Sequence, residues 1–393
     1  MSQAQRVQPD IEFIRELRAV GGDSLKQCYQ CATCSVACPI SPQENPFPRK
    51  EMIWAQWGLK DKLMRDPDVW LCYNCGGCSD LCPRGAKPAD LMSALRNMAY
   101  QRLAEPSIFA KWMSSPKYLP ILIAIPAVIW AIIWLIMASI NFGGMFNGGM
   151  FPQGEIIYGK IFYGDFTIDP VFIVVVFFVL FTFYKGVMNL IKELKPDGTT
   201  LVLGKQKHWI RCLIDVLFGE IMTHNKFTDC GTDTEKSARK IGHMTLFYSF
   251  VFLFIVTSFI FVCHWGGRLP WLSFMYIETP LPLYHPIKIL ALVGMIMMFV
   301  GLGYLTVRRK NLDKSKFVSN YYDWYLLGVI WVVAVTGGLS LFFRLADWVV
   351  PAYSVYYLHL ISVFMLFFYL PWSKLGHLVY RTAAITYVRY IGR

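Results

Sequence analysis

Hydrophobic positions divide the chain into a polar-patterned first part and a much more apolar second part. Residues 1–118 mix apolar and charged positions as a globular domain does, whereas most of residues 119–377 lies in long apolar runs. Six runs reach about 20 residues, the length that an α-helix needs to cross a bilayer. The sequence therefore predicts six transmembrane helices, near residues 119–140, 170–191, 243–264, 286–307, 323–344 and 354–375.

Lysine and arginine are concentrated in alternate connections between these runs. They gather in the loop after the second run, in the loop after the fourth run and in the C-terminal tail, while the other connections hold little beyond Lys160, Arg268 and Arg344. Because cytoplasmic loops carry such an excess of positive charge, we expect six spans in the inner (cytoplasmic) membrane with both termini in the cytoplasm. The net charge of +12 has the same origin, which favours membrane lipid and disfavours nucleic acid as a partner.

The first 105 residues predict a small α-helical domain, so the whole chain is expected to be all-α. Residues 10–20 have the pattern of an amphipathic helix closed by Gly21-Gly22, and further helices are expected near 51–64 and 88–103. A proline-containing linker over 106–118 leads to the membrane domain, 119–393. The N-terminal residues lack the basic and apolar regions of a signal peptide, so we expect this head to stay in the cytoplasm.

A further amphipathic stretch lies between the second and third spans. Over residues 205–222, apolar side chains recur at helical spacing behind a basic start that includes Trp209. This pattern predicts a helix that either lies in the cytoplasmic interface of the membrane or packs on the bundle.

Eight of the eleven cysteines form two runs of identical spacing. Each run reads C-x2-C-x2-C-x3-C-P, the spacing of two-cluster ferredoxins, in which the fourth cysteine of each run binds the other cluster. We therefore predict two [4Fe–4S] clusters. Their ligands are Cys28, Cys31, Cys34 and Cys82 for cluster 1, and Cys72, Cys75, Cys78 and Cys38 for cluster 2.

Zinc and disulfide bonds are the alternatives for these cysteines. Both are disfavoured by the doubled eight-cysteine spacing and by the reducing cytoplasm, where disulfides are rare. The remaining cysteines, Cys212, Cys230 and Cys263, have no such spacing and are expected to be small buried side chains.

Histidines stand at both ends of two predicted spans. His243 and His264 flank the third span, and His359 and His377 flank the sixth. On one continuous helix, the 18 residues from His359 to His377 are five turns, or roughly 27 Å on a single face. The third and sixth spans run antiparallel, so His243 and His377 share the cytoplasmic level while His264 and His359 share the outer level.

Ionisable residues inside a membrane are rare and usually functional, so this arrangement predicts two b-type haems, each between two imidazoles. The inner haem is assigned to His243 and His377, and the outer haem to His359 and His264, with His285 as the alternative partner of His359. The other interpretation is that these histidines are interfacial and bind no haem. His208 and His224, in the cytoplasmic loop, are not predicted as ligands.

Two segments resemble the membrane subunit of respiratory nitrate reductases. Tyr357–Tyr380, YLHLISVFMLFFYLPWSKLGHLVY, resembles that family's last helix, whose two haem-binding histidines are matched by His359 and His377. KIGHM resembles the start of its second helix, which supports pairing His243 with His377. That family's next ligand falls where this chain has Leu253, so the resemblance leaves the partner of His359 open and a single haem as the alternative.

Lys288, in HPIKILALVG, matches a lysine that this same family uses at its quinone site. A lysine just inside a helix end can donate a hydrogen bond to a quinone carbonyl. The other interpretation is an anchor whose charged end reaches the membrane surface.

The head, Cys28–Cys82, resembles the iron–sulfur subunit of heterodisulfide reductases. Head and cytochrome in one chain resemble the C subunits of quinone-interacting membrane-bound oxidoreductase complexes of sulfate reducers. That resemblance implies menaquinone as the quinone, flavin-containing heterodisulfide reductase A-like subunits as partners and adenylylsulfate reductase as the electron partner.

The expected function is electron transfer between menaquinol and these partners through b haems and two [4Fe–4S] clusters. The chain would serve as a subunit of an oxidoreductase, with no catalytic residues of its own and a direction of electron flow set by reduction potentials. One alternative is the membrane subunit of a heterodisulfide- or sulfite-pathway reductase. A second is a redox-sensing membrane anchor that exchanges no electrons with quinone.

Overall fold

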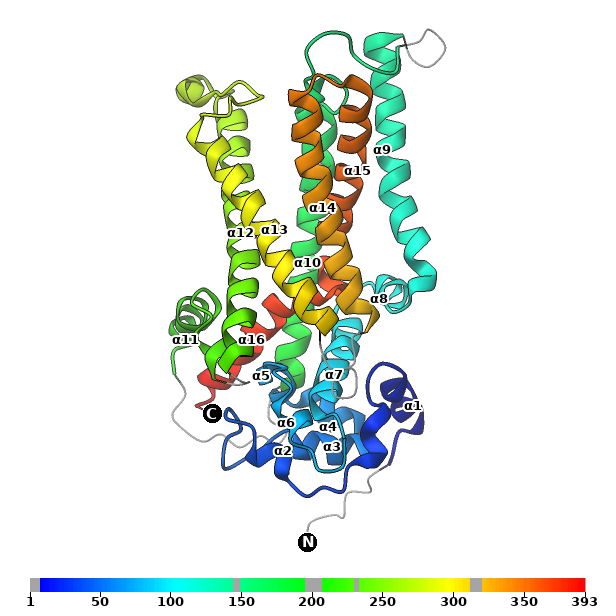
Figure 1. Ribbon diagram of the computed structural model, residues 1–393, viewed down its shortest axis with the longest axis vertical. Helices are drawn as coiled ribbons and strands as arrows, with labels where there is room; N and C mark the ends of the chain where they lie inside the picture. Colours follow the sequence, from blue (N-terminus) through cyan, green and yellow to red (C-terminus); the bar gives the residue numbers. More distant parts are fainter. Residues whose placement is uncertain (1–7, 144–148, 195–206, 230–232, 312–319, 393) are drawn as a thin grey trace.

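The structure is a computed structural model that describes residues 8–143, 149–194, 207–229, 233–311 and 320–392. Within these ranges the chain forms helices and no strands, which confirms the predicted all-α fold. Figure 1 shows a small helical head at one end of a bundle of long upright helices. The first helix, α1 (Ile11–Ala19), and the last, α16 (His377–Tyr390), both lie at the head end of the bundle.

The head is built around α7 (Pro88–Leu103), which confirms the helix predicted at these residues. Met92 and Leu95 on α7 are fully buried. Pro88 occupies the first helical turn, where its missing N–H leaves no intrahelical hydrogen bond unmade. Short helices pack around α7: α2 (Thr33–Val36), α3 (Arg49–Gln56), α4 (Lys60–Arg65), α5 (Asp68–Leu71) and α6 (Gly77–Asp80).

The predicted amphipathic helix at the N-terminus is also confirmed. The Asp10 carboxylate accepts a hydrogen bond from the Phe13 N–H at 2.8 Å and so caps α1. Gly21 adopts a φ of +136°, and the Gly22 N–H donates to the Leu17 carbonyl at 2.8 Å. These glycines end the helix where the sequence predicts its end.

The single helix predicted over 51–64 is wrong, because the structure has two helices there. α3 ends at Gln56 and α4 begins at Lys60, with Gly58 at a φ of +66° between them. The Gly58 carbonyl accepts a hydrogen bond from the Asp10 N–H at 3.1 Å, and a Cβ on Gly58 would lie 2.8 Å from the Asp10 carbonyl oxygen. The close approach of α1 therefore requires a glycine in the left-handed region, which breaks the helix.

In the described part of the chain, six helices are long and apolar enough to cross a membrane, at the six places predicted. Many of their large apolar side chains are exposed, such as Phe177 and Phe254 at 68% and 69%, as expected for surfaces that face lipid. The helices are α9 (Leu119–Phe142), α10 (Asp169–Leu194), α12 (Asp233–Gly266), α13 (Pro286–Asn311), α14 (Tyr321–Leu345) and α15 (Val349–Phe368).

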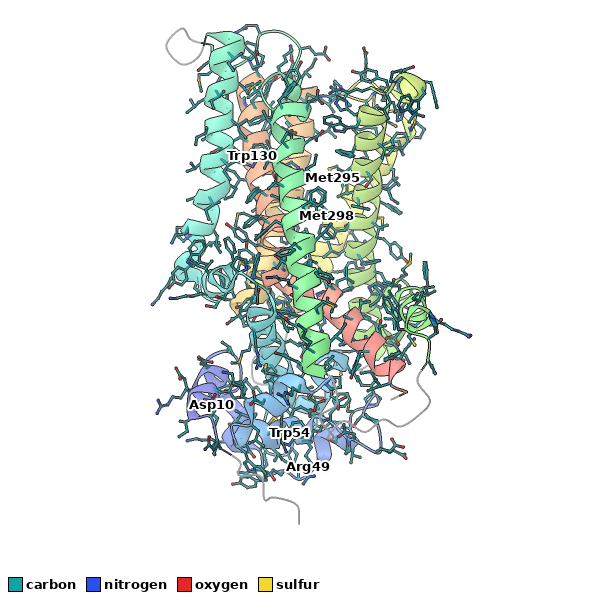
Figure 2. The ribbon with its side chains drawn as sticks, turned by 180° about the vertical axis from the view of Figure 1, so that it is seen from behind. Asp10, Arg49, Trp54, Trp130, Met295 and Met298 are labelled. Atoms are coloured by element: carbon teal, nitrogen blue, oxygen red, sulfur yellow. The ribbon has the colours of Figure 1, made fainter. Side chains whose placement is uncertain are left out.

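These helices pack mainly in pairs, with α12 along α13 and α14 along α15. The first pair approaches closely because Gly301 of α13 faces Leu246, whose N atom would lie 2.7 Å from an added Cβ. Figure 2, seen from behind, shows Met298 on α13 and Trp130 on α9, which are among the large side chains buried in the bundle. In the same view Arg49 and Trp54 lie in the head.

The last span is shorter than the predicted 354–375, because α15 ends at Phe368. Pro371 cannot donate an N–H to the carbonyl four residues earlier, and its ring clashes with that carbonyl, so a straight helix cannot continue. Two short turns follow, and His377 is the first residue of the separate helix α16. His359 and His377 therefore do not share one helical face, and the predicted rise of five turns between them is wrong.

Two other boundaries differ between the sequence prediction and the structure. The segment 106–118, predicted as a linker, contains the helix α8 (Ser107–Met113). The Trp372 indole N–H donates to the Ala104 carbonyl at 3.1 Å, which ties the start of this segment to the turn after α15. The third membrane helix begins at Asp233 rather than near His243, so His243 lies well inside α12.

The amphipathic stretch before α12 forms α11 (Trp209–Val216), which continues as a short π-helical turn, Leu217–Ile221. Cys212 and Val216 are buried, and α11 packs against α16. Ile210, Ile214 and Phe218 form an exposed stripe on the other side. Figure 1 shows α11 end-on beside the upright α12, so this apolar stripe lies across the bundle axis at the head end. The predicted packing on the bundle is thus confirmed for one face of α11, and the position of the other face in the membrane interface stays a prediction.

Candidate functional site

The two cysteine runs form two loops of the same shape, 44 residues apart. In the first loop Gln30 and Ala32 have positive φ angles of 61° and 69°, and in the second loop Asn74 and Gly76 have 50° and 90°. A four-residue helix, α2 or α6, follows each loop, and these two helices pack together. The left-handed residues turn the backbone sharply between cysteines, so that the side chains of one loop converge.

The cysteine side chains gather in the two groups predicted from the motif. Burial and then repulsion from Cys28 and Cys82 raise the pKa of Cys34 to about 11. Burial also raises the pKa of Cys38 to about 11, and the thiols that repel it belong to Cys72 and Cys75 of the other run. Cys82 thus lies near Cys28 and Cys34 of the first run, and Cys38 lies near Cys72, Cys75 and Cys78 of the second.

The same raised pKa values bear on what these sulfurs can bind. Uncharged thiols are poor metal ligands, and binding of a cationic iron–sulfur core would stabilise the thiolates that burial disfavours. A single zinc ion would draw four sulfurs to about 3.8 Å from one another. Among the residues that the structure describes, the carboxylates discussed next are the one set of three potential ligands whose atoms all lie within 4.8 Å. No three of the described cysteine sulfurs lie within this distance of one another.

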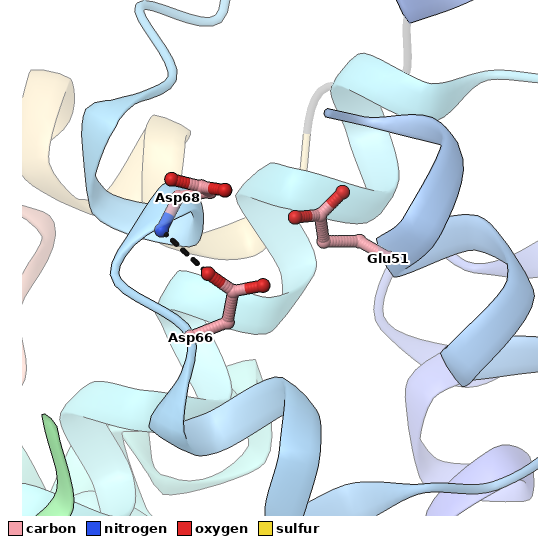
Figure 3. Close-up of side chains that lie close together, drawn as sticks. All are labelled: Glu51, Asp66 and Asp68. Atoms are coloured by element: carbon pink, nitrogen blue, oxygen red, sulfur yellow. Dashed lines mark hydrogen bonds between the residues drawn. The ribbon is translucent and has the colours of Figure 1, made fainter. Parts of the chain in front are cut away.

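The carboxylates of Glu51, Asp66 and Asp68 are buried together in the head, as Figure 3 shows. The Lys50 ammonium lies 2.5 Å from Asp68 Oδ2, 2.7 Å from Asp66 Oδ2 and 3.6 Å from Glu51 Oε1. Burial, followed by repulsion from Asp66, raises the pKa of Glu51 well above its usual range. Because Lys50 already neutralises part of this charge and Glu51 favours its protonated form, the set is a buried ion-pair cluster that joins α3 to α5.

The second cysteine loop lies against the end of the bundle that carries α16. The Arg381 guanidinium, on α16, lies 3.9 Å from the ring centre of Tyr73 and donates to the Leu71 carbonyl at 3.3 Å. Tyr73, next to Cys72 in the chain, meets the Phe227 ring edge-on at 6.2 Å between ring centres. Phe227 in turn lies 4.9 Å from the ring centre of His243 on α12. A continuous set of aromatic contacts therefore joins the second cysteine loop to the inner histidines.

His243 and His377, predicted as one pair, are brought together at this junction. Their ring centres are 6.3 Å apart and their planes make an angle of 78°. His377 Nδ1 lies 2.7 Å from the Lys374 carbonyl oxygen, so Nδ1 carries the hydrogen and Nε2 keeps a free lone pair. Burial lowers the pKa of His377 to about 4, which keeps this ring neutral.

The ring separation can be compared with that of two imidazoles on one metal ion. A metal–nitrogen distance of about 2 Å, with the nitrogen about 1.15 Å from its ring centre, places the two ring centres about 6.3 Å apart. His243 and His377 are thus close enough that both could supply nitrogen donors to one metal ion, and they are the residues that would hold a haem iron here.

A third histidine, His224, stands at the same place and was not predicted to take part. His224 is buried, and its Nε2 lies 2.8 Å from His243 Nδ1. Its position in a loop, 19 residues before His243, carries no periodic signal that sequence reasoning could use. Folding of the turn after α11 brings it to α12.

The outer histidines are not brought together in the same way. His264 Nε2 is hydrogen-bonded to Asp165 Oδ1, and Arg268 forms an ion pair with the other oxygen of this carboxylate. His359 Nδ1 lies 3.0 Å from Thr336 Oγ1, whose hydroxyl donates to the Val332 carbonyl at 2.6 Å. Thr336 Oγ1 therefore accepts from His359 Nδ1–H. The His359 ring also has a backbone hydrogen-bond partner in Val333. No contact between His264 and His359 is found in the described part of the chain.

The two remaining predicted residues lie at the outer end of α13. His285 immediately precedes this helix, and its Nδ1 accepts a hydrogen bond from the Ile287 N–H at 3.3 Å. Lys288 is half-buried in the first turn. Neither residue contacts His359 in the described part of the chain.

Comparison with known proteins supports the cysteine domain. A family of 4Fe–4S dicluster domains matches residues 24–86. The C subunit of the H(2):CoB-CoM heterodisulfide,ferredoxin reductase of Methanothermobacter marburgensis is 42% identical over 91 residues, which cover 23% of this chain and 49% of that protein. A protein of Archaeoglobus profundus that is named as similar to the C subunit of heterodisulfide reductase is 33% identical over 105 residues, 26% of this chain and 54% of that protein.

The chain thus spans about half the length of the curated relatives it matches. No solved structure gives a significant match. The similarity covers about a quarter of this chain and does not include the membrane bundle. The bundle is supported by the set of six apolar helices found in the described residues. The N-terminal head is accordingly a 4Fe–4S dicluster domain homologous to the C subunit of heterodisulfide reductases, carried on a six-helix membrane bundle.

Proposed function

We propose that this chain transfers electrons between membrane menaquinol and cytoplasmic flavin-containing partners, through haem b and two [4Fe–4S] clusters. The relatives of its head are subunits of reductase complexes, which supports a role as an electron-transfer subunit of an oxidoreductase. The observation that carries the proposal is the junction of the head with the bundle. There, Tyr73 beside Cys72 contacts Phe227, and Phe227 contacts His243, one of the two facing imidazoles.

In this proposal cluster 2 is the cluster next to the membrane and cluster 1 faces the partner. Cys72, a proposed ligand of cluster 2, is covered by Arg96 and Arg381, whose positive charges also suit an anionic cluster. Cys31, a proposed ligand of cluster 1, is exposed, as are the neighbouring Tyr29 and Val36. Electrons can leave the chain only where a partner can approach a cluster closely, which favours the cluster 1 side.

Each menaquinol oxidised would release two electrons to the chain and two protons to the membrane surface. His243 and His377 would hold the inner haem, and His359 would hold an outer haem with His264 or His285. We place the chain in the inner membrane with both termini in the cytoplasm, supported by the basic loops and by the position of α1 and α16 at one end of the bundle. The proposed partners are heterodisulfide reductase A-like flavoprotein subunits, with adenylylsulfate reductase as the electron partner.

The test is purification of the full chain in mild detergent together with the subunits that accompany it. Iron, acid-labile sulfide, haem and flavin are measured, and a menaquinol analogue is then added while haem absorbance is followed. We expect iron and sulfide for two four-iron clusters, b-type haem that the quinol analogue reduces, and a flavin-containing partner. A preparation with clusters and no quinol-reducible haem would leave a redox-sensing anchor as the function.

A second candidate function is favoured by the names of the relatives, which are subunits of heterodisulfide reductases. In that case the chain would be the membrane subunit of a heterodisulfide- or sulfite-pathway reductase. The same purification separates the two candidates, because this complex would bring a cysteine-rich disulfide-reducing subunit in place of a flavoprotein.

The proposed quinone contact is Lys288. Loss of a hydrogen bond from a charged donor costs about 1.5–3 kcal/mol, so Lys288→Ala should slow quinol oxidation about tenfold or more. Lys310, exposed in the last turn of the same helix, offers a matched control. Equal quinol kinetics in Lys288→Ala and Lys310→Ala, at unchanged haem content, would remove Lys288 from the quinone site.

A further inference from the structure

We propose that His224 is a positioning residue that accepts a hydrogen bond from His243 and thereby sets the orientation and electron-donating strength of this imidazole toward the inner haem. This inference rests on the proposed function, because it assigns His243 to the haem. Nothing in the sequence pattern or in the relatives of the head points to His224. The geometry of three imidazoles at the junction does.

The direction of the hydrogen bond follows from the partners of His224. Its Nδ1 faces the Met222 carbonyl oxygen at 3.4 Å, and a carbonyl can only accept. Nδ1 of His224 therefore carries the hydrogen, and Nε2 is the acceptor. The 2.8 Å contact to His243 Nδ1 must then be donated by His243, which leaves Nε2 of His243 with its lone pair.

His377 has the same tautomer, with the hydrogen on Nδ1, and donates it to a different acceptor. Its Nδ1–H donates to the Lys374 carbonyl, so both facing imidazoles present an unprotonated Nε2. Metal-binding histidines usually donate their other N–H to such an acceptor, which fixes the ring and makes it a stronger electron donor. The two sides of the site differ only in the acceptor, a peptide carbonyl for His377 and an imidazole for His243.

His224 is held in place as a rigid acceptor would be. It is 3% exposed, and its backbone adopts a φ of 51°. Its N–H donates to the Glu220 carbonyl and its carbonyl accepts from the Phe227 N–H, each at 3.0 Å. A non-glycine residue in the left-handed region is retained only where the surroundings enforce it.

The same loop is tied to the head and to α16 by the side chain of Glu220. The Tyr73 hydroxyl donates to Glu220 Oε2 at 3.3 Å, and Arg389 forms an ion pair with Oε1. Both nitrogens of His224 are engaged, by Met222 and by His243. These contacts make His224 a support for a ligand rather than a ligand itself.

The test compares His224→Leu, which removes the acceptor, with His224→Gln, which retains one in its side-chain amide oxygen. The inner haem is followed by redox titration of its optical absorbance and by its EPR spectrum in the purified complex. We expect His224→Leu to shift the inner-haem midpoint potential to more positive values, because a weaker donor stabilises ferric iron less, and to change the low-spin EPR signal. His224→Gln should restore both toward the wild type.

His208→Leu is the matched control, because His208 is an exposed histidine of the same loop. It should leave the potential and the EPR signal unchanged. If His224→Leu does not accumulate, His224→Met fills a similar volume with a much weaker acceptor and serves in its place. A wild-type potential and EPR signal in the acceptor-free variant, with the inner haem present, would overturn the role of His224 while leaving the proposed function intact. Absence of haem from the wild-type complex would overturn both.

Discussion

The sequence predicts a pair of histidines at each end of the bundle, yet in the structure the histidines at the two ends have different surroundings. At the inner end His243 and His377 face each other, and each donates its Nδ1–H to an acceptor. At the outer end His359 alone has this arrangement, with Thr336 as acceptor. His264 instead uses its Nε2 for a hydrogen bond with Asp165.

The difference shows that a similar position along the bundle does not by itself bring two histidines together. The inner site is assembled from α12, from α16 and from the loop after α11, which the head holds together through Tyr73, Arg381 and Glu220. The outer histidines each find a partner on a neighbouring helix and do not meet in the described residues. Because the head contacts the inner end, the histidines at that end are already held in position, whereas the outer histidines are not.

The largest expected effect is at the inner end. His377→Ala removes one of two facing nitrogen donors, so we expect the complete loss of one b-type haem per chain, seen in the pyridine haemochrome content and the reduced-minus-oxidised spectrum. His208→Ala should keep the full haem content. Unchanged spectra in His377→Ala would disprove the inner pair.

At the outer end, the double variant His264→Ala/His285→Ala removes both proposed partners of His359. We expect it to lose the outer haem and keep the inner one, and the single variants then show which histidine binds. Because neither His264 nor His285 contacts His359 in the described residues, the outer haem should also be lost first during detergent purification. Full haem content in the double variant would mean that neither histidine is a ligand.

A smaller effect is expected from adding one methyl group at each end. A Cβ on Gly186 would lie 2.3 Å from Tyr380 Oη, and Tyr380 is fully buried on α16, one turn after His377. Overpacking of this kind costs about 1–3 kcal/mol, so Gly186→Ala should lower the thermal midpoint and loosen the inner haem.

Gly337 is the counterpart at the outer end, where a Cβ would lie 3.1 Å from His359 Cε1. A displacement of a few tenths of an ångström relieves this contact, so Gly337→Ala should cost less than Gly186→Ala. Gly303→Ala, with nothing within 4 Å, is the control for helix propensity. Equal thermal midpoints for Gly186→Ala and Gly337→Ala would show that the two ends are packed equally tightly.

The smallest effect is expected for Tyr73→Phe. This change removes one hydrogen bond to Glu220 and keeps the ring between Arg381 and Phe227. The expected loss is about 0.5–1.5 kcal/mol of stability at the junction, with haem content retained. Thermal unfolding followed by haem absorbance measures it, and a lost inner haem in this variant would show that the hydroxyl, rather than the ring, holds the junction.

Much of this molecule is determined by local sequence. The spacing of each cysteine run dictates a loop whose sulfurs converge, and the length of each apolar run dictates a helix that can cross a membrane, because both depend on residues close together in the chain. The six spans appear where predicted, and the head matches 4Fe–4S dicluster domains over residues 24–86. A proline within a predicted span, Pro371, was a local signal that the last helix ends early.

The tertiary structure alone decided which histidines meet and through which nitrogen. His377 reaches His243 from a separate helix, and His224 comes from a loop that has no periodic pattern. The free nitrogen of each ring depends on the atom opposite the other nitrogen: the Lys374 carbonyl, the Thr336 hydroxyl or the Asp165 carboxylate. Such partners are distant in sequence or set by a turn, and only folding brings them within hydrogen-bond distance.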